Sequence, residues 1–292
     1  MSPSKITKRG WTIWHVAFSI LLAAAAVFIA ADAWLDLITI ALKDEESSHV
    51  LLVPVAVLWI GLVRRGTLRN CRPVGYWFGP LLIALGWFLW SFGYKRDVQA
   101  FWHGGAIVMA VGAVTTALGS DVVKRLWPAF LVLVFLVPVP GMIRQSVAQP
   151  MQTATAFLTQ SMGELAGMQV ERWGNMLTIN DRQVAVAEAC NGMRMVFTLS
   201  LVSYVFAFTT PLLPYVRAAI VIASPVTAIL CNVIRLVPTV WVFGHFPEST
   251  AEKFHTFSGW VMLGVGFLLL TGIVRLFRWL MIPVTPFRLA MN

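Results

Sequence analysis

The stretch VRAAIVIASPVTAILCNVIRLVPTVWVF at 216–243 decides the fold of this chain. Its only charged residues are Arg217 and Arg235. A helix needs roughly 20 mostly apolar residues to cross the hydrocarbon of a bilayer, and this stretch is longer than that. We expect Pro225 and Pro238 to bend or break it. The stretch therefore predicts a membrane-spanning segment.

The composition of the whole chain agrees with this prediction. Of 292 residues, 58% are hydrophobic and 12% are charged, whereas soluble domains carry about 25% charged residues. This composition excludes a soluble enzyme and a disordered chain. The three cysteines are too few for a disulfide framework. The chain is therefore predicted to be a polytopic membrane protein.

Seven other apolar runs have a similar character, so we expect an all-α polytopic membrane protein with about eight transmembrane helices. The second and fifth runs are short, which fits helix ends or kinks at Pro54 and at the Pro138/Pro140 pair. The first run is too long for a signal peptide and is expected to stay as a helix. We treat 1–292 as a single integral membrane domain. The predicted spans are 11–31, 49–63, 75–92, 98–118, 122–137, 190–208, 216–243 and 255–276.

The positions of the charges predict the orientation of these spans. The net charge is +9, but the basic residues punctuate apolar runs instead of forming a nucleic-acid-binding arm. With the N-terminus inside, the inner loops hold 13 of the 22 basic residues and, of the acidic residues, only Asp121. An excess of Lys and Arg is typical of cytoplasmic loops. Both termini are therefore predicted to be cytoplasmic, with no nucleic-acid partner.

The longest segment between predicted spans covers 144–188 and falls on the outer side. Its first half places apolar residues at roughly helical spacing, which predicts an amphipathic helix at the membrane interface. Its second half alternates apolar and polar residues around Val170, Leu177 and Val184, which favours short strands. Asn180-Asp181 suits a turn between two of them. We expect a small extracytoplasmic amphipathic and short-strand segment between spans five and six.

Three reactive side chains are predicted to lie at the outer ends of the last three spans: Cys190, Arg235 and His255. A cysteine near a helix N-terminus with cations nearby is a better nucleophile, because its pKa is lowered. Histidine can carry the thiol proton to a leaving group, and arginine can hold a developing oxyanion. Together they predict a cysteine-dependent acyl-transfer site.

Each of the three also has a structural interpretation. A lone cysteine at a helix start is usually a small buried hydrophobe. A lone histidine at the interface is usually an amphipathic anchor, and an arginine at a span end usually extends toward lipid headgroups. One rival function is a membrane acyl- or glycan-transferase that uses His255 or His49. Another is an assembly factor of envelope polysaccharide export without cysteine catalysis. A transporter is disfavoured, because polar residues gather at one face and the halves do not match.

Five short motifs, in order, resemble those of the exosortase/archaeosortase family. ACNGMR at 189–194 resembles the family's A-C-S-G-x-R signature, NVIR at 232–235 its N-x-x-R segment, and HTFSG at 255–259 its H-x-x-x-G element. Earlier in the chain, SHVLLVP at 48–54 resembles the S-H-G motif and FLVPVP at 135–140 an apolar run ending in P-x-P. The resemblance covers about 44–260. Serine in the first motif is replaced by Asn191, and glycine after the early histidine by Val50.

The resemblance implies that Cys190 is the nucleophile, His255 the acid/base and Arg235 its electrostatic partner. Arg194, Asn232 and His49 would support the site. The implied substrates are exported proteins with a C-terminal signal made of a short motif, a transmembrane helix and a basic tail. The implied enzyme is a cysteine endopeptidase or transpeptidase of the inner membrane, multi-pass, with its site on the extracytoplasmic side. No cofactor or metal is expected, because no ligand cluster has the required spacing.

Overall fold

A computed structural model describes residues 12–68, 71, 77–180, 182–185 and 192–280. The protein is a predominantly helical polytopic membrane protein whose chain forms two compact units, Met1–Pro140 and Gly141–Asn292. The prediction of a single integral membrane domain stays a prediction.

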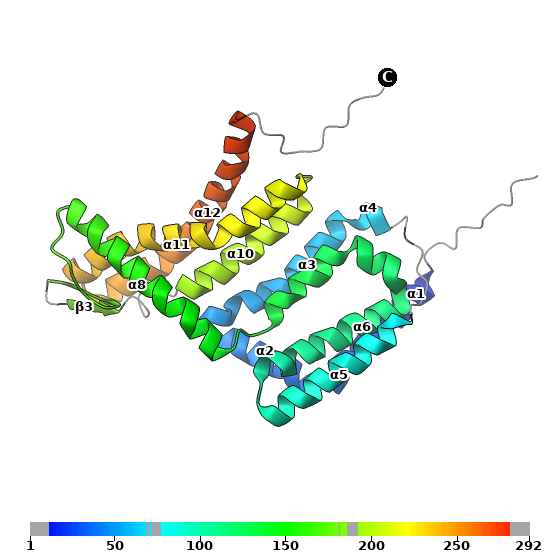
Figure 1. Ribbon diagram of the computed structural model, residues 1–292. Helices are drawn as coiled ribbons and strands as arrows, with labels where there is room; N and C mark the ends of the chain where they lie inside the picture. The colour runs from blue at the N-terminus through cyan, green and yellow to red at the C-terminus, as the bar shows by residue number, and fades with distance from the viewer. Residues whose placement is uncertain (1–11, 69–70, 72–76, 181, 186–191, 281–292) are drawn as a thin grey trace, which may run out of the picture. The chain divides into compact units, whose positions relative to one another are not determined.

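The regular elements in the described part of the first unit are all helices. Its longest helices, α5 and α6, lie side by side as an antiparallel hairpin (Figure 1). The elements are α1 (Ile13–Ile29), α2 (Ala31–Lys43), η1 (Glu45–Leu52), α3 (Val53–Val63), α4 (Arg65–Leu68), α5 (Phe78–Arg96), α6 (Gln99–Arg125), α7 (Trp127–Leu131) and η2 (Val132–Leu136), where η marks a 3-10 helix. The predicted first span corresponds to α1, and α2 follows it at a bend of 79°.

Glycines explain why α5 and α6 pack so closely. Gly79, Gly86 and Gly93 recur every seventh residue on the face of α5 that α6 covers, and all three are buried. A methyl group on Gly86 would lie 2.5 Å from the backbone nitrogen of Met109. Small residues let membrane helices bring their backbones together, which increases dispersion contacts. The close packing of the hairpin therefore depends on glycine at these three positions.

Two aspartates of α2 make polar contacts with this hairpin. Asp36 Oδ2 lies 2.9 Å from Nε2 of His103, whose side chain is fully buried. The carboxylate of Asp32 accepts hydrogen bonds from the indole nitrogens of Trp90 and Trp102, at 3.2 and 3.3 Å. A buried polar group is stable only when it is paired, so the contact of His103 with Asp36 favours this position of α2, and the exposed Asp32 adds two more bonds.

The end of α3 and the end of α6 meet within the first unit. The Nη1 of Arg64, which follows α3, donates to the backbone oxygen of Arg125, the last residue of α6, at 3.4 Å. That both residues lie on the cytoplasmic side of the membrane stays a prediction. Near the same end, α6 is kinked at Gly119, where φ is +81°. The kink falls at the boundary drawn between the fourth and fifth predicted spans.

The described part of the second unit combines four helices and a small sheet; the amphipathic character predicted for the first of these helices stays a prediction. Its elements are α8 (Gly141–Leu165), β1 (Glu171–Trp173), β2 (Met176–Ile179), β3 (Arg182–Ala185), α10 (Gly192–Thr209), α11 (Pro214–His245) and α12 (Glu248–Trp279). The strands form an antiparallel sheet in the order β1-β2-β3. It lies where the sequence favours short strands, and Asn180 occupies the turn with φ +48°. That the segment is extracytoplasmic stays a prediction.

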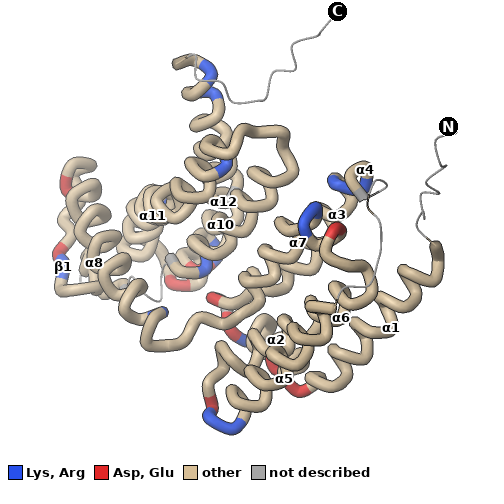
Figure 2. Tube along the Cα trace, turned by 45° about the vertical axis from the view of Figure 1, so that its right-hand side comes forward, with Lys and Arg blue, Asp and Glu red and all other residues tan. Residues whose placement is uncertain are grey.

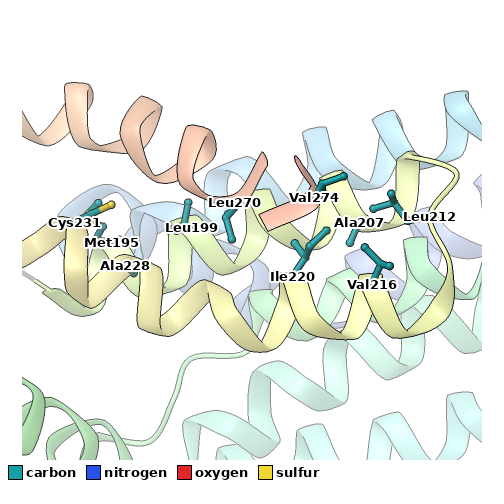
Figure 3. Close-up of a cluster of buried hydrophobic side chains, with 10 residues drawn as sticks. All are labelled: Met195, Leu199, Ala207, Leu212, Val216, Ile220, Ala228, Cys231, Leu270 and Val274. Carbon is teal, nitrogen blue, oxygen red and sulfur yellow. The ribbon is translucent and has the colours of Figure 1, made fainter. Parts of the chain in front are cut away.

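The helices α10, α11 and α12 share one apolar core, shown in Figure 3. It contains residues from each helix and from the loop before α11: Met195, Leu199, Ala207, Leu212, Val216, Ile220, Ala228, Cys231, Leu270 and Val274. Helix α11 continues through Pro225 and Pro238, so neither proline breaks it. At Pro225 the carbonyl of Val221 loses its usual N–H partner, and the hydroxyl of Ser224 donates to that oxygen at 2.8 Å instead.

Four described helical segments are long and apolar enough to cross a membrane: Glu46–Val63, Gln99–Arg125, Pro214–His245 and Glu248–Trp279. The number rises to six if each of two bent helix pairs is one span, and Met193–Thr209 is a shorter apolar helix. Figure 2 shows that the middle turns of α6 and α12 carry no charged residue. The predicted count of eight spans and the cytoplasmic termini stay predictions.

Candidate functional site

The side chain of Arg235 lies inside the second unit, on α11. It is 8% exposed, and its Nη2 reaches Oδ1 of the buried Asn232 at 3.5 Å, one helical turn earlier. Its Nε is buried with no hydrogen-bond partner among the residues that the structure describes. A guanidinium has five N–H donors, so most of the hydrogen-bonding capacity of Arg235 is not used by Asn232.

Helix α12 presents Gly259 to this guanidinium. A Cβ at Gly259 would lie 3.0 Å from Nη1 of Arg235, so the absence of a side chain makes room for the cation. His255 stands one turn before Gly259 on the same helix and is half-buried. Its backbone oxygen accepts a hydrogen bond of 2.9 Å from the buried hydroxyl of Ser258. The structure thus brings the N-x-x-R and H-x-x-x-G motifs together.

The first turn of α10 belongs to the same end of the helical core. Met195 on α10 packs in one cluster with Cys231, the residue before Asn232 on α11. Cys231 is a buried free cysteine, and Arg194 on α10 has an exposed side chain. Cys190, the predicted nucleophile, lies outside the described residues, two positions before the start of α10.

The electrostatics of Arg235 favour an anionic ligand. No salt bridge joins Arg235 to an acidic side chain among the residues that the structure describes. Burying a cation away from water is costly unless an opposite charge or several acceptors compensate. A carboxylate, a thiolate or the oxyanion of a tetrahedral intermediate would supply that compensation.

His49 belongs to the first unit and contacts backbone oxygens. Its Nδ1 lies 3.1 Å from the oxygen of Glu46, and the ring also hydrogen-bonds the backbone of Phe135 on η2. These contacts join the SHVLLVP and FLVPVP motifs, which are far apart in the sequence. The bonds explain a structural role for His49, and its predicted support of the catalytic site stays a prediction.

The sequence did not reveal the reason for the glycine in the H-x-x-x-G motif. Gly259 is one of several glycines on α12, and at Gly264 and Gly272 an added methyl group would have no atom within 4 Å. Only the contact with Arg235 distinguishes the motif glycine from these two.

Within the described ranges, no group of three or more His, Cys, Asp or Glu side chains is placed to hold a metal ion.

Comparison with known families identifies a match over most of the chain. The family model described as "Transmembrane exosortase" matches residues 34–272. The matched range includes all six residues that the sequence assigned to the site. Comparisons with curated proteins and with solved structures give no match.

Proposed function

The chain belongs to the transmembrane exosortase family, and from this premise we propose that it is a membrane cysteine endopeptidase or transpeptidase. Its substrates would be exported proteins with a C-terminal sorting signal: a short motif, a transmembrane helix and a basic tail. The buried guanidinium of Arg235 carries the proposal. It has an Nε without a partner among the described residues and lies against Gly259, one turn from His255.

The reaction would proceed through a thioester. His255 takes the proton of the Cys190 thiol, and the thiolate attacks the carbonyl carbon of the scissile peptide bond. Arg235 donates hydrogen bonds to the oxyanion of the tetrahedral intermediate. The C–N bond then breaks as His255 protonates the leaving amine, which leaves an acyl-enzyme. Water or an acceptor amine then attacks the thioester carbonyl and gives a proton to His255. The C–S bond breaks, the product leaves, and His255 returns the proton to the Cys190 thiolate.

Burial gives Arg235 its strength in this role. A donor that stabilises an oxyanion in a water-excluded site contributes about 2.7–4 kcal/mol to catalysis, which corresponds to a factor of about 100 to 1,000. Lysine would keep the charge but lose the planar fork of donors. Arg235→Lys should therefore lose most activity although its charge is unchanged.

The processing of a tagged reporter with such a signal, followed by immunoblot in cells, tests this function. Cys190→Ser and Arg235→Lys should both abolish most processing. Cys231→Ala is the matched control, because Cys231 is a buried free thiol of the helical core that has no part in the proposed reaction. Normal processing by Cys190→Ser would refute cysteine catalysis and favour a transferase or an assembly factor.

The proposed site faces outward across the inner membrane. Its support is the charge asymmetry of the loops, which predicts that Cys190 is outside and Cys71 inside. A membrane-impermeant thiol reagent should therefore label Cys190 in intact cells and spare Cys71. Labelling of Cys71 alone would reverse the orientation.

A further inference from the structure

The β2–β3 hairpin is bonded to the C-terminal end of α11. The Nη1 of Arg182 donates to the backbone oxygens of Phe243 and Phe246, at 3.1 and 2.6 Å. The Nδ2 of Asn180 lies 3.4 Å from the oxygen of Gly244. The last carbonyls of a helix have no partner within it and carry partial negative charge. An arginine is therefore a suitable cap for this helix end.

The sheet also packs against α11 through apolar contacts. Gly244 lies so close to the sheet that a methyl group there would be 2.7 Å from Cγ2 of Ile179. One buried cluster joins strands β2 and β3 to α11. It contains Ala156, Val170, Leu177, Ile179, Val184, Leu236 and Val240, of which the last two belong to α11. Leu236 directly follows Arg235, so the sheet supports the part of α11 that bears the guanidinium.

Strand β3 is also the element that leads toward the predicted nucleophile. It ends at Ala185, and Cys190 follows five positions later in the sequence. We propose that Arg182 is a positioning residue: by tying β3 to the end of α11, it fixes the strand that precedes Cys190 relative to the helix that carries Arg235. The inference rests on the proposed function, because it assumes that Cys190 and Arg235 act together.

A positioning role differs measurably from simple capping. Loss of a C-terminal cap lowers the stability of the helix end but would leave the reactivity of Cys190 unchanged. Loss of a positioning contact should lower turnover, because small misplacements of reacting groups cost up to about 100-fold in rate. It should also alter the rate at which Cys190 reacts with an alkylating reagent, which needs no substrate.

The experiment uses the full chain in membranes, with Cys71→Ser and Cys231→Ala so that Cys190 is the one remaining thiol. N-ethylmaleimide measures the alkylation rate, and the tagged reporter measures processing. Arg182→Ala should change the alkylation rate at least about threefold and lower kcat about tenfold with little effect on KM. Arg182→Lys, which can still donate to one carbonyl, should recover part of both.

Arg172→Ala is the matched control. Arg172 lies on β1 of the same sheet, but it bonds Gln160 and the oxygen of Gly174 instead of α11. Its variant should keep the parent's alkylation rate and kcat. The inference is overturned if Arg182→Ala keeps the parent's alkylation rate, or if Arg172→Ala changes it equally. Processing by Cys190→Ser would instead refute the proposed function, so the two failures are distinguishable.

Discussion

Replacing Gly259 by alanine should lower the activity of the site without unfolding the protein. The new Cβ would lie 3.0 Å from Nη1 of Arg235, whereas ordinary contact begins at 3.4 Å. The guanidinium must therefore move by a few tenths of an ångström. The atom that has to move is the end of a flexible side chain, so the backbone of α11 can stay in place.

The two expected effects have opposite signs. Alanine is a better helix former than glycine by roughly 1 kcal/mol, so the melting temperature of Gly259→Ala should not fall. A misplacement of about 1 Å can cost about 100-fold in rate. For the smaller displacement of Arg235 we expect kcat/KM to fall about tenfold, which equals about 1.4 kcal/mol of transition-state stabilisation.

Reporter processing and the melting temperature in detergent should be measured together for each variant. Gly264→Ala and Gly272→Ala are matched controls, because they lie on the same helix and no atom is within 4 Å of the added methyl group. Both should process the reporter at the parent rate. If Gly259→Ala does the same, the contact with Arg235 has no catalytic importance and the reasoning is refuted.

Three other predictions concern stability and thiol chemistry. Gly86→Ala should destabilise the α5–α6 hairpin by about 3 kcal/mol, because the added methyl group would collide with the backbone of α6. Gly61→Ala is the control, because the space around Gly61 is open. The same Tm for both variants would contradict the prediction. Asp36→Ala should lower the free energy of unfolding by about 1–3 kcal/mol, because Nε2 of the buried His103 loses its acceptor. An unchanged midpoint of denaturant unfolding would show that this contact does not stabilise the protein. Burial, followed by the charge of nearby Asp121, raises the pKa of Cys71. A raised pKa leaves less thiolate at a given pH. Alkylation of Cys71 in permeabilised membranes should therefore be slow at pH 7 and become faster at higher pH. Labelling of Cys71 at the rate of a free peptide thiol would contradict the raised pKa.

The sequence predicted the helical membrane class because apolar run length is a direct consequence of bilayer thickness. It also placed short strands near Leu177 and Val184, where alternation matches the pleat. It did not predict α2 as a separate helix, because Ala31 continues the apolar run without a capping residue. The 79° bend there is accompanied by tertiary contacts of Asp32 and Asp36, which no local pattern reveals.

The glycines that pack α5 against α6 follow a regular spacing in the sequence. The seven-residue spacing of Gly79, Gly86 and Gly93 marks one face of a helix. The spacing does not identify the partner helix. The sequence favours a bend or break at Pro225, whereas in the structure the hydroxyl of Ser224 donates to the carbonyl of Val221, which the proline leaves without an N–H partner. Serine or threonine beside a proline is a signal that such a helix can continue.

For the site, motif resemblance supplied the residues, and the structure supplied reasons for some of them. The N-x-x-R spacing puts Asn232 one turn from Arg235, and the structure adds the hydrogen bond between them. The contact between Arg235 and Gly259 joins two helices, so it could not be deduced from either motif alone. Arg182 was overlooked because it belongs to no motif and acts through backbone oxygens.

The central claim is that Cys190 forms a thioester with the substrate. The most direct test is mass spectrometry of the protein trapped by acid during turnover of the tagged reporter. The account predicts an acyl adduct on Cys190 that hydroxylamine removes, that Cys190→Ala lacks, and that Arg235→Lys forms much more slowly. Processing of the reporter with no adduct on Cys190, or at the same rate in Cys190→Ala, would contradict the account.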